Sequence, residues 1–159
     1  MSKTRILVVS DTHGNDEILK KLVKKYEHFE YLIHLGDHIW DIDDIEFKGK
    51  ALSIKGNADR GAKGASDRVF TIDGYNIWLT HGHLYCVKFG LNKLFYSALE
   101  KKADIVIFGH THVALNINYE NMLFFNPGSL AYPRGTNIGS YGIIEFDKKK
   151  INANILEFD

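Results

Sequence analysis

Residues 6–14 of the chain read ILVVSDTHG, an apolar run that ends at a small residue and leads at once into Asp11 and His13. A short apolar run bounded by turn residues is typical of a buried strand. Gly14 then lets the chain leave the strand sharply, because glycine tolerates the backbone conformations of tight turns. The segment therefore predicts a strand that carries a carboxylate and an imidazole to its carboxyl end.

Four further segments repeat this arrangement. Each is an apolar run that ends at Gly or Thr before a possible metal ligand: LIHLGD at 32–37, LSIKGN at 52–57, IWLTH at 77–81 and IVIFGH at 105–110. Ligands of α/β sheets bind beyond the carboxyl ends of the strands. Five such ends with oxygen or nitrogen donors therefore predict one shared site.

The donor types restrict the chemistry of that site. The seven donors are Asp11, His13, Asp37, Asn57, His81, His110 and His112. Imidazole together with carboxylate and amide oxygen suits Mn, Fe, Zn or Ni rather than Ca or Mg. Seven donors exceed the needs of one tetrahedral ion, so two ions that share a carboxylate are the simplest interpretation. Taken singly, Asp-x-His is a weak signal and Gly-Asp or Gly-Asn pairs usually mark turns; the interpretation depends on the whole set.

The periodicity of the chain predicts an α/β fold. Helices are expected over 15–28 and 87–102, where apolar residues form one stripe. Strands are expected over 6–10, 31–35, 51–55, 68–72, 76–80, 104–108, 114–119, 122–125, 142–146 and 151–158. Two mixed sheets packed face to face, with helices outside, accommodate this order.

Length and composition exclude several classes of protein. The 159 residues, without a repeat or linker, predict a single domain over 1–159. Twenty basic residues balance twenty acidic ones, so the overall charge gives no strong signal for nucleic acid or an acidic membrane. Cys86 is the single cysteine and excludes an intrachain disulfide. No apolar run approaches the ~20 residues of a membrane span, so we expect a cytoplasmic protein.

The motifs resemble those of a known family. Asp11-x-His13, Gly36-Asp37, Gly56-Asn57-x-Asp59, His81 and Gly109-His110-x-His112 occur in the order of the calcineurin-like metallophosphoesterase signature. The length of the chain and the segments Asn126-Pro127-Gly128-Ser129 and Pro133-Arg134 resemble its small YfcE-type phosphodiesterase branch. This resemblance implies a four-layer α/β/β/α sandwich of two mixed sheets.

The resemblance also implies a mechanism. It assigns Asp11, His13, Asp37 and His112 to one divalent metal, and Asn57, His81 and His110 to a second, with Asp37 bridging. A hydroxide that bridges the metals would attack a small phosphodiester, for example a nucleotide. Manganese is the first expectation, with iron, nickel or zinc as alternatives. Two divalent ions bring more positive charge than two carboxylates neutralise, and the surplus favours water ionisation and phosphate binding.

One position departs from the family pattern. Many members carry a histidine that assists the leaving group where this chain has Ala58. We therefore hypothesise a preference for phosphodiesters or aryl-like leaving groups over alkyl monoesters, unless His83 or His38 replaces that acid. A phosphomonoesterase is the alternative enzyme. A non-catalytic, protein-binding scaffold of the same fold, such as the retromer subunit, is the alternative from another class.

The remaining polar residues have weaker signals. His83 and Asp59 are predicted to support catalysis, and Arg60, His38 and Arg134 are predicted to bind substrate. Each prediction has a structural alternative, because loop histidines are often solvated and surface arginines are common. The sequence leaves a homo-oligomer, such as a dimer, open.

Overall fold

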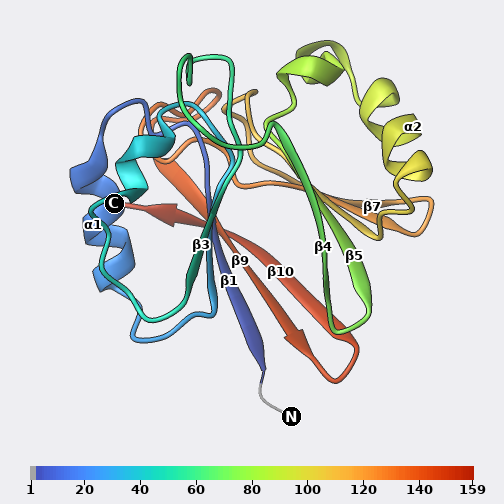
Figure 1. The fold of residues 1–159 in the computed structure, drawn as a ribbon, viewed down its shortest axis with the longest axis horizontal. Coiled ribbons are helices and arrows are strands. Elements are labelled where there is room, and N and C mark those ends of the chain that lie inside the picture. The colour runs from blue at the N-terminus through green and yellow to red at the C-terminus, as the bar shows by residue number, and fades with distance from the viewer. Residues whose placement is uncertain (1–2) are drawn as a thin grey trace.

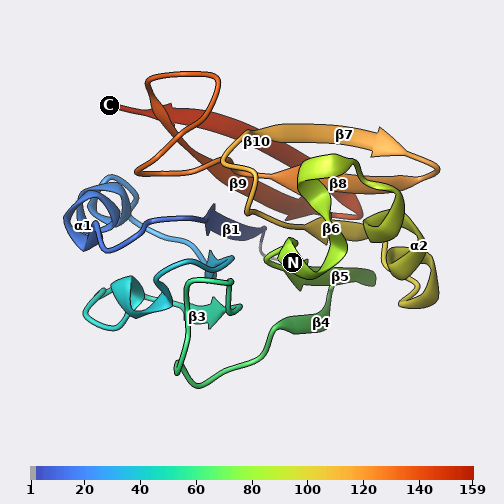
Figure 2. The same ribbon diagram turned by 90° about the horizontal axis from the view of Figure 1, so that it is seen from above.

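The computed structural model describes residues 3–159 and forms two five-stranded mixed sheets (Figures 1 and 2). The first sheet has the order β10-β9-β1-β2-β3. Its strands are β1 (Thr4–Val9), β2 (Tyr31–His34), β3 (Lys50–Ser53), β9 (Gly139–Asp147) and β10 (Lys150–Phe158). β1, β2 and β3 run parallel, whereas β9 is antiparallel to both β1 and β10.

The second sheet has the order β4-β5-β6-β8-β7. Its strands are β4 (Asp67–Ile72), β5 (Tyr75–Thr80), β6 (Ile105–Ile107), β7 (Leu115–Tyr119) and β8 (Met122–Asn126). β5, β6 and β8 are parallel, and antiparallel hairpin partners close both edges. Asp73-Gly74 form the tight connection between β4 and β5.

The central strands are apolar on both faces, because one face of each sheet packs on the other sheet and the opposite face is covered by an outer layer. In β1, Ile6 and Val8 belong to the core between the sheets, whereas Leu7 and Val9 face the outer layer. In β5, Ile77 faces inward while Trp78 faces outward. Strands buried on both faces appear in a sequence as continuous apolar runs rather than as alternating patterns.

Two helices form the outer layers on opposite sides of the sheets (Figure 1). The helix α1 (Asp16–Lys24) is capped by Asn15, whose side chain accepts a hydrogen bond from the Ile18 amide at 3.3 Å. Its apolar face packs on the first sheet, and α2 (Asn92–Glu100) packs on the second. The predicted four-layer α/β/β/α sandwich is thus confirmed.

The prediction of one continuous helix over 87–102 is wrong at its start. The structure has two short 3₁₀ turns, η2 (His83–Tyr85) and η3 (Val87–Phe89), before α2. Gly90 has φ +130° and interrupts the chain between η3 and α2. Such a φ lies outside the helical region, so an apolar stripe alone could not carry the helix through this residue. A third 3₁₀ turn, η1 (Ile39–Ile42), follows β2.

Over residues 3–159, neither α1 nor α2 has the length and apolar character required to cross a membrane.

Candidate metal centre

The predicted ligands come together at the carboxyl ends of strands from both sheets. Five of them have a left-handed backbone, with φ of 55° at Asp11, 46° at His13, 62° at Asp37, 70° at His110 and 59° at His112. This conformation is uncommon for residues other than glycine and is tolerated where surrounding contacts enforce it. The side chains of these five residues meet in two adjoining groups of donors that share Asp37.

The first group of donors consists of Asp11, His13, Asp37 and His112, whose ligand atoms all lie within 4.8 Å of one another. Asp11 Oδ1 lies 3.2 Å from His112 Nε2. His13 Nε2 lies 3.4 Å from His112 Nε2 and 3.5 Å from Asp37 Oδ2. These four residues match the set that the resemblance implied for one metal.

The second group consists of Asp37, His81 and His110. His81 Nε2 lies 3.4 Å from Asp37 Oδ1, 3.1 Å from His110 Nδ1 and 3.2 Å from Asn57 Oδ1. Asp37 therefore directs its Oδ2 atom toward the first group and its Oδ1 atom toward the second. A carboxylate in this position is suited to be shared by two ions.

The tautomers of two imidazoles are set by backbone carbonyls. His81 Nδ1 donates to Leu35 O at 2.7 Å, and His112 Nδ1 donates to Tyr132 O at 2.6 Å. In each neutral ring the Nε2 lone pair then faces the cluster. The sequence does not reveal these acceptors, because they lie 46 and 20 residues away from the rings they orient.

The arrangement fits divalent cations. Ligand atoms about 2.1 Å from a tetrahedral metal are about 3.4 Å apart, close to the separations found here. Asp11 Oδ1 is buried and makes no hydrogen bond within residues 3–159 while His112 is neutral, because His112 Nε2, 3.2 Å away, then presents a lone pair. Imidazole lone pairs in contact and a buried carboxylate oxygen without a partner are unfavourable unless a cation lies between them.

Electrostatics hold both carboxylates in their charged form. Burial raises the pKa of Asp11, but the hydrogen bond from His112 and the charge of His81 outweigh it and leave that pKa below its usual range. Burial likewise opposes the charge of Asp37, and its contacts with His81 lower its pKa overall. Ionised carboxylates are the form that binds a metal.

The pKa values of the two imidazoles in the second group are shifted in opposite directions. Burial lowers the pKa of His81, yet the hydrogen bond with Asp37 and the charges of both carboxylates raise it overall. Burial, followed by the charges of His81 and Lys88, lowers the pKa of His110 to about 4. Without a metal, His81 thus tends to carry the proton and His110 stays neutral.

Asp59 stabilises the loop that carries Asp37. Its Oδ2 atom accepts hydrogen bonds from the amides of Asp37 and Gly56, both at 2.8 Å. Its Oδ1 atom accepts from the amides of His38 at 2.7 Å and Ile39 at 3.0 Å. Asp59 is buried, and its four contacts place it behind the ligands rather than among them.

A second buried residue, His34, connects two ligand loops. Its Nδ1 atom accepts from the Gly36 amide at 3.1 Å, and its Nε2 atom contacts Thr12 Oγ1 at 2.8 Å. Burial lowers the pKa of His34 to about 4, so the ring is neutral and Nε2 is the donor. Thr12 lies between two ligands, so this link fixes their relative position.

His38 and His83 lie beside the cluster in different environments. His38 Nδ1 donates to Asp41 Oδ1 at 2.7 Å, and Asp41 Oδ2 accepts from the Gly14 amide at 3.0 Å. His83 lies with its ring centre 5.3 Å from that of His81, and its buried Nδ1 makes no hydrogen bond with any described residue. Burial and the charge of His81 lower the pKa of His83. Asp41 was not identified from the sequence, since its contact with the Gly14 amide spans 27 residues.

The two predicted arginines differ in position. Arg60 is exposed on the loop between β3 and β4. Arg134 lines an open cavity of about 470 Å³ together with His13, His112 and Tyr132, and its amide donates to His112 O at 2.9 Å. Arg134 therefore lies beside the first group of donors, at the open side of the cluster.

Asn126 secures the turn that carries His110 and His112. Its Nδ2 atom donates to Gly109 O at 3.1 Å and Thr111 Oγ1 at 3.0 Å, and its Oδ1 atom accepts from the Gly128 amide at 2.9 Å. Asn126 begins the Asn-Pro-Gly-Ser segment on which part of the family resemblance rested.

Comparison with known proteins identifies the family. The profile of the calcineurin-like phosphoesterase superfamily domain matches residues 4–149. The chain belongs to this family of metallophosphoesterases, and the resemblance seen in its motifs is confirmed.

Three similar proteins illustrate this membership. The probable metallophosphoesterase YsnB of Bacillus subtilis is 33% identical over 147 residues, which cover 89% of this chain and 84% of YsnB. Phosphodiesterase YfcE of Escherichia coli is 31% identical over 116 residues, covering 68% of this chain and 59% of YfcE. The crystal structure of a predicted phosphoesterase from Streptococcus pneumoniae superposes with a TM-score of 0.83 at 31% identity, covering 99% of this chain and 91% of that one.

Proposed function

We propose that this protein is a metal-dependent phosphodiesterase that uses two divalent cations sharing Asp37. The observation that carries the proposal is the division of the ligand atoms into two groups with Asp37 in both. The name of the relative YfcE, a phosphodiesterase, supports the same reaction. Manganese is the proposed metal, with iron, nickel or zinc as alternatives.

The proposed roles follow from the contacts. Asp11, His13 and His112 bind one ion with Asp37, while Asn57, His81 and His110 bind the other with the same carboxylate. The cations, when bound, supply activation of water and stabilisation of charge on the phosphoryl oxygens. Asp59 and His34 position the ligand loops, and Arg134 attracts the anionic substrate at the open side of the cluster.

The environment of position 58 supports the preference for diesters. Ala58 donates its amide to Asp37 Oδ1 at 3.0 Å and offers no side chain that could protonate a leaving group. His83, with its lowered pKa, is neutral near pH 7 and is a weak proton donor. His38, oriented by Asp41, is the remaining imidazole that could donate a proton. Good leaving groups, such as aryloxides, depart without this help because they are weak bases.

A non-catalytic scaffold is the second candidate, and two observations favour it. Ala58 removes the acid found in many members, and Leu84 and Phe89 in the η2–η3 segment are 59% and 93% exposed. Exposed apolar side chains of this size are typical of protein-binding surfaces when they cluster. The complete set of ligands favours the enzyme.

The test is hydrolysis by metal-free protein supplied with one metal at a time. We expect bis(p-nitrophenyl) phosphate to be hydrolysed faster than p-nitrophenyl phosphate, and an alkyl monoester slowest. Asp37→Asn and His81→Ala should each lower kcat by at least about 100-fold. Retained activity in both variants would refute the site, and faster turnover of the alkyl monoester would refute the diester preference.

A single domain over 1–159 and a cytoplasmic location remain predictions from the sequence, which leaves a homo-oligomer, such as a dimer, open.

A further inference from the structure

A largely apolar cavity lies next to the proposed metal centre. It has a volume of about 520 Å³ and is bounded by the η3 segment on one side and by residues 111–115 on the other. Val87, Leu91, Val113 and Leu115 supply apolar walls. Thr111 and Val113, which flank the ligand His112, both line it, so the cavity begins where the ligand turn ends. A volume of this size suits a small organic group.

Two cationic side chains, Arg134 and Lys88, lie between the cavity and the metal centre. Arg134 lines this cavity and also the open one beside His13 and His112, so it separates the two. Lys88 lines the same cavity from η3, and its charge acts on His110. An anionic phosphodiester bound at the metals would therefore have both cations beside it, and one of its substituents could extend past them.

The uncharged polar side chains of the cavity wall, Thr111 and Asn126, already have partners within the protein. Thr111 Oγ1 accepts from Asn126 Nδ2 at 3.0 Å and from the Val113 amide at 3.2 Å, and it donates to Val113 O at 3.2 Å. Asn126 uses its remaining atoms on Gly109 and Gly128. A hydroxyl-rich substituent packed against these two side chains would lose water without gaining hydrogen bonds, whereas an apolar one loses nothing.

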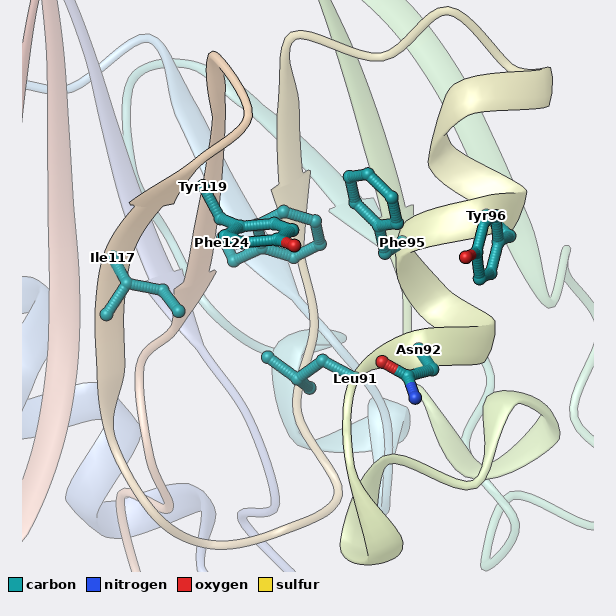
Figure 3. Close-up of a pocket in the computed structure, with 7 residues that line it drawn as sticks. All are labelled: Leu91, Asn92, Phe95, Tyr96, Ile117, Tyr119 and Phe124. Carbon is teal, nitrogen blue, oxygen red and sulfur yellow. The ribbon is translucent and has the colours of Figure 1, made fainter.

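The apolar wall continues beyond this cavity. Leu91 also lines a second cavity of about 250 Å³ between α2 and β7. Figure 3 shows Phe95 on α2 facing Tyr119 and Phe124, which line this second cavity together with it. Leu91 thus lines both cavities, one beside the metal centre and one among aromatic rings.

We infer that the substrate is an anionic phosphodiester with an apolar alkyl or aryl substituent. The substituent occupies the cavity between η3 and residues 111–115, and Lys88 and Arg134 lie beside the phosphate. The inference rests on the proposed phosphodiesterase activity and specifies its substrate class. Binding energy from such a remote substituent is available to the reaction when the cavity holds the substrate in a productive position.

A substituent series tests this assignment. Methyl, butyl and hexyl p-nitrophenyl phosphates share one leaving group, so they differ only in the length of the spectator chain. We expect kcat/KM to rise roughly tenfold from methyl to butyl and further to hexyl, because each fully buried methylene contributes about fourfold at most. Thymidine 5′-(p-nitrophenyl phosphate), which carries a polar sugar, should be no better than the methyl compound.

Variants locate the effect in the cavity. Val113→Ser and Leu91→Ala should each reduce the hexyl-to-methyl ratio of kcat/KM at least about threefold. Val113 is 49% exposed, so its replacement keeps the test valid if Leu91→Ala fails to fold. Lys88→Ala should lower kcat/KM for all chain lengths by a similar factor. Lys48→Ala, at an exposed position before β3, is the control and should leave rate and ratio unchanged.

The outcomes separate this inference from the proposed function. If none of the diesters is hydrolysed with any metal, the proposed phosphodiesterase activity fails. If they are hydrolysed at rates independent of chain length, or if the thymidine compound is preferred, the activity stands and the apolar substrate class is refuted. An unchanged ratio in both cavity variants would equally refute the assigned cavity.

Discussion

At the scale of single residues, the metal ligands could be predicted from the sequence, whereas the residues that position or surround them could not. The ligand types and their order are visible in the sequence, because five of the ligands come at the end of an apolar run and the other two, His13 and His112, lie two residues further on. Asp41 is not, because its contact with Gly14 spans 27 residues and only the folded chain creates it. Lys88 was likewise missed, since a lysine outside every motif resembles any surface lysine.

Asp59 is expected to stabilise both the fold and the loop that carries Asp37. Asp59→Asn replaces two acceptor oxygens by one, so at least one of the amides of Asp37, Gly56, His38 and Ile39 loses its partner. We expect a loss of about 1–3 kcal/mol in the free energy of unfolding, and metal affinity about 10–100-fold weaker because the ligand loop shifts. Denaturant titration and calorimetric metal titration measure the two effects. Asp44→Asn, at an exposed position, is the control; equal behaviour of the two variants would contradict the positioning role.

The two-ion proposal makes a prediction about stoichiometry. His110 belongs to the second group alone, whereas Asp37 belongs to both. We expect two ions per chain in the unmodified protein, one in His110→Ala, and at most one, weakly held, in Asp37→Asn. Elemental analysis after dialysis against a fixed free concentration of manganese gives these numbers. Two ions in His110→Ala would exclude His110 as a ligand.

At the scale of elements, the strands were predicted better than the helices. Strands β1, β2, β5 and β6 carry continuous apolar runs because both of their faces are buried, and turn residues bound them. Helix limits depend on backbone conformation as well as on apolar stripes. The helix expected over 15–28 ends at Lys24, and the one expected over 87–102 begins only at Asn92, after Gly90.

The close approach of β2 and β3 gives an element-scale prediction. Gly36, just after β2, has φ +110°, and a Cβ atom there would lie 2.6 Å from both Gly56 N and His81 Nδ1. Gly36→Ala should therefore cost more than about 3 kcal/mol in the free energy of unfolding, as clashes in a packed interior do. Gly61 has φ +80° with nothing within 4 Å of a Cβ, so Gly61→Ala isolates the backbone cost of about 1–2 kcal/mol. Equal costs in urea unfolding would mean that the close approach does not matter.

At the scale of the whole molecule, the site joins the two sheets. Asp11 and Asp37 come from the first sheet and His81 and His110 from the second, while the apolar core lies between the sheets beneath them. The topology that closes the sandwich therefore also assembles the ligands. Sequence periodicity predicted the layers, and the family resemblance implied how the ligands divide; the contacts that orient them required the folded chain.

Because ionisable side chains from both sheets meet at this site, the stability of the metal-free protein depends on pH. The pKa of His112 is raised, chiefly by its hydrogen bond with Asp11, and that of His81 is raised as described above. Their contribution to stability is complete below the ordinary histidine pKa of 6.5 and is lost as the pH rises through their raised values. The pKa values of His34 and His110, at about 4, act oppositely and reduce stability as the pH falls from 6.5 toward 4.

Metal-free protein should accordingly have its highest Tm near pH 6.5 and melt lower at pH 8.5, by about 2–4 °C for each kcal/mol lost. Saturating manganese should remove the decline on the alkaline side, because a divalent ion replaces the protons of His81 and His112 and binds only the folded chain. Differential scanning calorimetry with and without a chelator measures Tm on both the acid and the alkaline side of pH 6.5. His112→Gln should flatten the alkaline limb of the metal-free curve, whereas His28→Gln, at an exposed position outside the cluster, should not. A metal-free Tm that rises from pH 6.5 to 8.5 would show that the carboxylates do not depend on these protonated imidazoles, and the case for a cation as their natural partner would lose its electrostatic basis.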